Sequence, residues 1–227
     1  MPYAMHQKVD DELQRLQKEG IVEPVQFAEW AAPIVPILKA DKKSVRICGD
    51  YKLMVNRACK LDNYPIPRTE DLFAILSGGK FSTKLDLSQA YQQLLLDEEA
   101  KKFVVINTQR GLFQYNWLPF GVSSAPGIFQ RAMENLLQGI PNVIVCIDDI
   151  LVSGASEAEH LSVLRKVLSR LMEAGLRSKK RNVTLSANID HLVLQHQIEL
   201  LTLPKTRIRA DQDGVFGFPI ELTDPEL

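Results

Sequence analysis

Cysteine is scarce in this chain of 227 residues, and its three copies, Cys48, Cys59 and Cys146, show no metal-ligand spacing. An odd number of thiols without such spacing argues against a disulfide framework and fits reduced thiols inside the cell. No apolar signal-peptide core occurs between Met1 and Glu12, and no apolar run approaches membrane-spanning length. We therefore expect a soluble intracellular protein without a membrane partner.

Neither sign of charge is in excess, because 27 Lys and Arg residues face 28 Asp and Glu residues, for a formal net charge of −1. This balance excludes a globally basic nucleic-acid binder, so any contact with a phosphate backbone must come from local Lys and Arg patches. The sequence contains no internal repeat and no low-complexity tract. With 45% hydrophobic residues, the chain can form one domain or two small ones.

An apolar segment at 142–153 carries two adjacent carboxylates, Asp148 and Asp149, at its centre. Val, Ile and Leu on both sides predict a β-hairpin packed against a core. Ionised carboxylates are costly to bury and repel each other. A bound divalent cation would offset both effects, because hard cations prefer oxygen ligands. A plain Asp-Asp turn between two strands explains the same residues, since Asp favours turns.

A third aspartate, Asp86, lies near the end of another strand-like run at 81–87. Three carboxylates on neighbouring strand ends could hold two Mg²⁺ ions about 3.5–4 Å apart, the arrangement used for in-line phosphoryl displacement. The aspartates taken alone also fit a small metal-dependent phosphohydrolase.

Three segments in order carry a more specific signal, namely LDLSQAY at 85–91, LPFGVSSAP at 118–126 and IDDILV at 147–152. Their order and spacing resemble those of the reverse transcriptase of gypsy-type LTR retrotransposons. The resemblance implies a nucleotidyltransferase that acts as an RNA-directed DNA polymerase. Its fold would be α+β, with the fingers and palm of a right-hand polymerase and an antiparallel palm sheet backed by helices.

This resemblance implies that Asp86, Asp148 and Asp149 are catalytic and hold two Mg²⁺ ions, for which Mn²⁺ can substitute. It also implies the backbone carbonyl of Leu87 as a ligand. One ion would activate the primer 3′ hydroxyl, and the other would stabilise the leaving pyrophosphate. The family usually has Tyr where this chain has Cys146, near the expected primer terminus, so the departure concerns primer positioning rather than metal binding.

The same resemblance assigns Lys39, Arg46, Tyr91 and Phe120 to nucleotide binding. Lys39 and Arg46 flank a polar turn at 41–44, and they would neutralise a triphosphate because Arg binds phosphate oxygens bidentately and Lys acts as a point charge. Tyr91 would exclude a 2′-hydroxyl, and Phe120 would face the base or sugar. On the residues alone, the two cations fit a solvated hairpin and the two rings fit core aromatics.

Hydrophobic periodicity and end signals predict helices at about 5–19, 69–76, 124–137 and 156–175. Ser156 and Glu159 form the pattern of a capping box at the start of the last of these. Extended runs predict strands at 30–39, 45–51, 81–87, 101–107 and 111–117, and two prolines demote the first of them to an edge or irregular strand. The basic segment 177–181 either contacts a template-primer backbone or protects a solvated strand edge.

The resemblance covers roughly residues 1–181, with fingers at about 1–79 and palm at about 80–181. Residues 182–227 form an unassigned divergent tail, and no thumb is recognisable. The expected partners are a template-primer (RNA/DNA or DNA/DNA) and deoxynucleoside triphosphates. We expect the ribonuclease H, integrase and protease of the family's Pol polyproteins to be absent from this chain. The alternative function is a truncated remnant that cannot polymerise and acts at most as a nucleic-acid- or protein-binding module.

Overall fold

The structure, a computed structural model, describes residues 5–52, 55–58, 64–68, 70, 74, 79–87, 89–176 and 178–186, with only the backbone for Ala58 and 178–186. The described residues form two compact units. Among these residues, the first unit draws on the chain up to residue 58 and on Leu94–Ala125, and the second on the segments 64–93 and 126–186. The chain therefore leaves the first unit and returns to it before completing the second.

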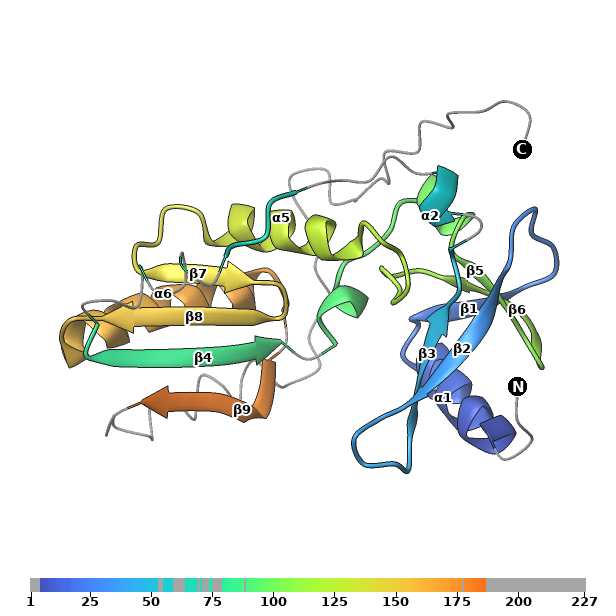
Figure 1. The fold of residues 1–227 in the computed structure, drawn as a ribbon, viewed down its shortest axis with the longest axis horizontal. Coiled ribbons are helices and arrows are strands. Elements are labelled where there is room, and N and C mark those ends of the chain that lie inside the picture. The colour runs from blue at the N-terminus through green and yellow to red at the C-terminus, as the bar shows by residue number, and fades with distance from the viewer. Residues whose placement is uncertain are drawn as a thin grey trace. The chain divides into compact units, whose positions relative to one another are not determined.

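The first unit contains a five-stranded sheet in the order β1-β6-β5-β2-β3 (Figure 1). Its strands are β1 (Val22–Val25), β2 (Ala32–Leu38), β3 (Val45–Gly49), β5 (Val105–Thr108) and β6 (Gly111–Tyr115). Its helices are α1 (His6–Lys18), α2 (Val55–Ala58) and α4 (Glu98–Lys101). As predicted, α1 is amphipathic, and it buries Val9, Leu13 and Leu16 where it packs on β1 and β3.

Of the two forms predicted for the proline-containing strand, edge or irregular, the edge position was wrong, because β2 lies between β5 and β3, whereas its pairing is irregular. The two neighbours pair with different parts of β2. β5 pairs only with Ala32 and Pro33, whereas β3 pairs with Ile34–Leu38. Among the described residues, each half of β2 thus has a partner strand on one side only, and such a strand tolerates a residue that lacks an N–H.

The second unit is built on an antiparallel sheet in the order β7-β8-β4-β9 (Figure 1). Its elements are β4 (Phe81–Leu87), η2 (Ala90–Gln93), α5 (Ala125–Leu137), β7 (Val143–Cys146), β8 (Asp149–Gly154), α6 (Glu157–Glu173) and β9 (Ser178–Ser186). The predicted strand at 81–87 and the predicted hairpin at 142–153 are confirmed.

Helix α6 packs on β8 and β4 and covers one face of this sheet. Leu164, Leu168 and Leu171 are fully buried, and burial of a leucine side chain contributes about 1.5–3 kcal/mol. The predicted cap at Ser156 is confirmed, since its hydroxyl accepts the N–H of Glu159. The Glu159 carboxylate, however, accepts the N–H of Ala155 and not that of Ser156.

The strand predicted at 101–107 begins later than expected, because Lys101 belongs to the short helix α4. Asp97 caps this helix by accepting the N–H of Ala100. Two ion pairs, Lys101–Glu98 and Lys102–Glu99, each join residues three positions apart and further stabilise this turn. The predicted helix at 69–76, apart from Glu70 and Ala74, and the tail beyond Ser186 lie outside the described residues. Among the helices of the described residues, none combines the length and apolarity needed to span a bilayer.

Candidate functional site

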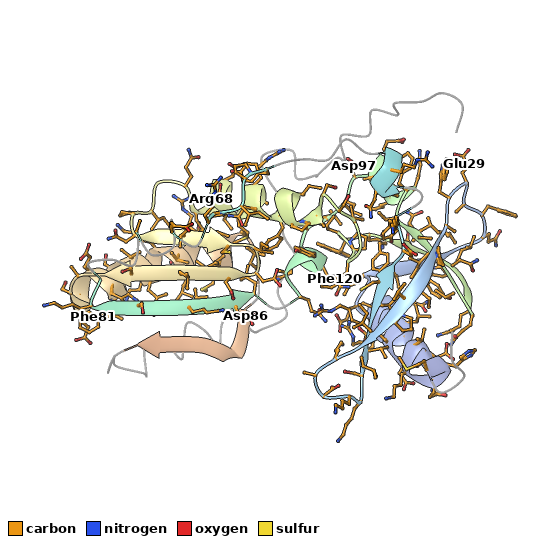
Figure 2. All side chains as sticks on the ribbon, viewed as in Figure 1. Glu29, Arg68, Phe81, Asp86, Asp97 and Phe120 are labelled. Atoms are coloured by element: carbon orange, nitrogen blue, oxygen red, sulfur yellow. The ribbon has the colours of Figure 1, made fainter. Side chains whose placement is uncertain are left out.

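Two of the three predicted carboxylates face each other across paired strands of the second unit. Asp86 on β4 is the register partner of Asp149 on β8, and Figure 2 shows Asp86 at the end of β4. Directly opposed residues of an antiparallel pair project from the same face, with Cβ atoms about 4.5–5.5 Å apart. Cys146 on β7 is the register partner of Asp149 on its other side. The register therefore places two carboxylates and a thiol in one row across three strands.

The third carboxylate belongs to the turn that joins β7 to β8. Asp148 is exposed there, and its carbonyl oxygen accepts the N–H of Leu87 at 3.0 Å. This bond ties the hairpin turn to the end of β4. Since Asp148 precedes Asp149 directly, the backbone of the turn determines the directions of both carboxylates.

Lys84 supplies a positive charge to this group. Its Nζ lies 2.6 Å from Oδ2 of Asp149, and both side chains are partly exposed. The hydrogen bond that Lys84 donates to Asp149 is the main reason why the pKa of Lys84 is raised, and the charges of Asp149 and Asp86 act in the same direction. Within the described residues, no three His, Cys, Asp or Glu side chains gather closely enough to hold a metal ion. One carboxylate of the predicted trio is instead turned toward an ammonium group.

Tyr91 lies on η2, one short turn beyond Asp86 in the chain. Its ring packs edge-on against Phe129 of α5, with centroids 5.6 Å apart and an interplanar angle of 68°. This geometry is favourable for an aromatic pair. Tyr91 is half-buried, and Phe129 supports its ring.

In the first unit, the structure brings Arg46 of β3 and Phe120 together. The Arg46 guanidinium carbon lies 4.5 Å from the Phe120 ring centroid, a cation–π contact worth about 0.5–1 kcal/mol at an exposed site. The carbonyl of Phe120 also accepts the N–H of Gly49 at 3.3 Å. The loop at 118–121 is thus attached to the strand that carries Arg46.

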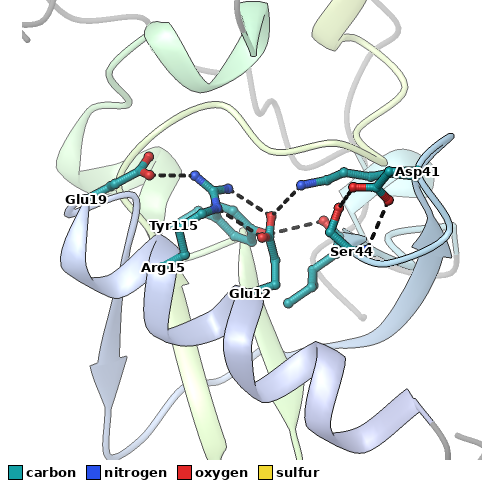
Figure 3. Close-up of polar contacts among 8 residues, drawn as sticks. Glu12, Arg15, Glu19, Asp41, Ser44 and Tyr115 are labelled. Atoms are coloured by element: carbon teal, nitrogen blue, oxygen red, sulfur yellow. Dashed lines mark hydrogen bonds and ion pairs between the residues drawn. The ribbon is translucent and has the colours of Figure 1, made fainter.

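Lys39 contacts a buried carboxylate instead. Its Nζ lies 3.4 Å from Oε1 of Glu12, a residue of α1 that is only 8% exposed. Glu12 also accepts two hydrogen bonds from Arg15, which in turn pairs with Glu19 (Figure 3). The two glutamates raise the pKa of Arg15. Lys39 therefore belongs to a structural ion-pair network as the molecule stands.

The turn between Lys39 and Arg46 is held by Asp41. Its carboxylate accepts the N–H groups of Lys43 and Ser44 and the Ser44 hydroxyl (Figure 3). These hydrogen bonds lower the pKa of Asp41 to about 2. The polar turn predicted at 41–44 is confirmed, and its acidic residue stabilises the hairpin that carries both cations.

Sequence reasoning missed two residues that contact the carboxylate hairpin, Lys84 and Gln130. Lys84 lies two positions before Asp86, and this spacing puts both on one face of a strand. Gln130 is fully buried on α5, donates to Val145 and accepts the N–H of Ile147. A glutamine within the apolar stripe of a helix is a signal that a polar partner lies opposite.

Comparisons with known proteins agree with the fold described above. Residues 37–202 match the family described as "Reverse transcriptase (RNA-dependent DNA polymerase)". The chain is similar to an uncharacterized protein of Caenorhabditis elegans, with 43% identity over 78% of this chain and 14% of that protein. It is also similar to the retrovirus-related Pol polyprotein from transposon 412 of Drosophila melanogaster, with 31% identity over 78% of this chain and 15% of that polyprotein.

A solved structure of the foamy viral protease-reverse transcriptase in complex with double-stranded DNA has a similar fold. The TM-score is 0.73 at 25% identity, over 79% of this chain and 31% of that one. The mixed helix-and-sheet architecture is thus the fingers and palm fold expected from the sequence, and this chain spans only a fraction of the length of the proteins it matches. The match over most of its length shows that the chain belongs to the reverse transcriptase (RNA-dependent DNA polymerase) family.

Proposed function

We propose that this chain is the polymerase domain of a gypsy-type retrotransposon Pol polyprotein, and that it adds deoxynucleotides to the 3′ end of a primer. The register pairing of Asp86 with Asp149 beside the Asp148 turn supports this proposal most strongly. Solved structures of foamy viral protease-reverse transcriptase contain double-stranded DNA or an RNA/DNA hybrid. We extend that ligand class to this chain as a template-primer of either type.

The donor types near the end of β4 are those that a divalent cation prefers, although the described side chains do not converge on a common ion position. Carboxylate oxygens from Asp86, Asp148 and Asp149, with the Leu87 carbonyl, are the hard ligands that Mg²⁺ and Mn²⁺ prefer. Asp149 already accepts an ammonium group at 2.6 Å, so the position is favourable for positive charge. Two ions bound there would supply the Lewis-acid chemistry of in-line phosphoryl displacement. The carboxylates would fix the ions, and the strand register would keep the carboxylates from moving apart.

We assign the recognition of the nucleotide to four side chains. Arg46 would bind phosphate oxygens from its position over Phe120, and Lys39 would add charge by exchanging Glu12 for a phosphate. Phe120 would offer a ring to the base or sugar. Tyr91, held against Phe129, would occupy the space that a 2′-hydroxyl needs and so exclude ribonucleotides.

The ion pair of Lys84 leads to a prediction about metal affinity. Lys84→Met removes an ammonium that both neutralises Asp149 and repels an incoming cation. Exposed ion pairs of this kind contribute at most about 1 kcal/mol, so we expect Mn²⁺ to bind roughly two- to fivefold more tightly, as measured by electron paramagnetic resonance titration. Lys80→Met is the matched control, because Lys80 lies at the opposite end of β4. Equal affinities in the two variants would contradict a role for Asp149 in metal binding.

Primer extension on poly(rA)/oligo(dT) with Mg²⁺ or Mn²⁺ tests the proposed activity directly. We expect the purified chain to lengthen the primer with dTTP and to use UTP poorly, and Tyr91→Ala to lose that preference. The second candidate function is a module that binds nucleic acid without turnover, and the existing Lys84–Asp149 pair favours it, since it satisfies Asp149 without a metal. Retained template-primer binding without extension would establish that second function instead.

A further inference from the structure

Gln130 is a fully buried amide on the face of α5 that meets the carboxylate hairpin. Its Nε2 donates to the carbonyl of Val145 at 2.7 Å and to Oε1 of Glu134 at 2.6 Å. Its Oε1 accepts the N–H of Ile147 at 2.8 Å. Burying an amide is costly unless its groups are bonded, and here donor and acceptor sides are both used. One side chain therefore links a helix to the end of β7 and to the turn that follows.

The turn that Gln130 contacts has an unfavourable backbone conformation. Cys146 and Asp149 are paired, so Ile147 and Asp148 are the two central residues of the hairpin turn. Ile147 has a φ of 54°, a value that suits glycine or asparagine at this position of a hairpin. For a β-branched residue this region costs about 1–3 kcal/mol and persists only where the surroundings impose it.

We propose that Gln130 is a positioning residue: it holds the strained turn at Ile147 and thereby fixes the directions in which Asp148 and Asp149 point. Gln130 meets the turn on both sides of Cys146, at the carbonyl of Val145 and the N–H of Ile147. Loss of this contact frees the turn to leave the positive-φ conformation and to reorient the two carboxylates that follow. The consequence for catalysis rests on the proposed polymerase function, whereas the effect on the turn does not.

Glu134 fixes the orientation of the amide. One of its carboxylate oxygens accepts from Gln130 Nε2, and the other accepts the hydroxyl of Tyr64. The carboxylate can only accept, so it keeps the NH₂ group of Gln130 on its own side and the carbonyl oxygen toward Ile147. The network thus extends from the segment at 64–68, through α5, to the turn that carries the carboxylates.

Amide hydrogen exchange tests the contact without any assay of activity. In Gln130→Met, which keeps the length of the side chain but removes its polar groups, we expect the Ile147 amide to exchange at least about tenfold faster. The Lys80 amide, which donates to Gly154 at the far end of the same sheet, should keep its wild-type rate. An unchanged rate at Ile147, or an equal acceleration at Lys80, would overturn the proposal.

A second pair of variants, in which the double variant relieves the repulsion of the single one, covers the case in which Gln130→Met does not fold. Gln130→Glu sets two carboxylates against each other and should expose Ile147 to exchange. Adding Glu134→Gln restores a donor opposite position 130 and leaves an acceptor for Ile147, while the Val145 carbonyl still lacks its donor, so protection should return in part. If the double variant exchanges as fast as the single one, Gln130 does not act through this network.

Rescue by glycine separates positioning from simple stabilisation. For primer extension, Gln130→Met should lower kcat about 10- to 100-fold with an unchanged KM for dTTP, because misdirected carboxylates affect the reaction more than binding. When Ile147→Gly is added to Gln130→Met, kcat should recover to near the value of Ile147→Gly alone, since glycine adopts a positive φ without strain. Thr83→Val, which removes the buried hydrogen bond to His160, should leave kcat unchanged.

If Ile147→Gly gives no rescue, or if kcat falls equally in Thr83→Val, Gln130 only stabilises the core and does not position the carboxylates. If the wild-type chain extends no primer, the proposed function fails. The exchange rate of the Ile147 amide then tests by itself whether Gln130 holds the turn.

Discussion

Asp86→Asn should leave the chain folded and able to bind a template-primer, but slow primer extension by about a thousandfold or more. Asp86 is opposed by Asp149 across paired strands, and like charges in that position repel. Replacing one of them by a neutral isostere should therefore keep or slightly raise the melting temperature. The same change removes one of the carboxylates proposed to hold the metal ions. Melting temperature, template-primer affinity and single-turnover extension rate, measured together, distinguish a chemical defect from a folding defect.

Asp149→Asn should show the same loss of turnover, while Glu173→Gln serves as the charge-matched control. Glu173 is exposed at the end of α6, so its replacement removes one negative charge from the same unit away from β4. We expect the control to extend primers at the wild-type rate. Similar extension rates in Asp86→Asn and Glu173→Gln would refute the assignment of Asp86 to the reaction, and with it the proposed polymerase activity.

Gly121→Ala should destabilise the first unit by about 3 kcal/mol or more, because two costs add. Gly121 has a φ of 106°, where side chains are strongly disfavoured, and a Cβ there would overlap the carbonyl oxygen of Gly49. Gly121 also lies beside Phe120 and offers its own carbonyl to Asn56 at 2.9 Å. A forced movement at this position should therefore shift the Phe120 ring away from Arg46. Denaturant unfolding measures the loss of stability, and a raised KM for dTTP would indicate that the Phe120 ring has shifted.

Gly111→Ala is the matched control for this substitution. Gly111 has a similar φ of 102° in the same unit, but nothing lies within 4 Å of its added Cβ. Gly111→Ala should therefore lower the free energy of unfolding only by the cost of the positive φ, about 1 kcal/mol. Equal losses in the two variants would mean that the contact between Gly121 and Gly49 carries no energy, and the link between the 118–121 loop and β3 would have to be abandoned.

Much of the fold was predictable because its local signals agree with one another. The strand at 81–87, the hairpin around Asp148 and the capped helix after Ser156 each combine periodicity with an end signal. The edge position expected for β2 and the strand start expected at Lys101 were wrong for a different reason. The first depended on which strand pairs with which part of β2, and the second on a short helix held by the side chain of Asp97. Neither partner can be identified from a periodicity.

The same distinction applies to the candidate site. The residue types and the order of three segments were enough to select Asp86, Asp148 and Asp149 and to indicate the family. They could not show that Lys84 pairs with Asp149, that Lys39 contacts Glu12, or that Gln130 bonds to the turn at Ile147. Each of these contacts joins segments distant in the chain. Alternation along a strand or helix sets the face of a side chain, but only strand register and helix packing decide which group lies opposite.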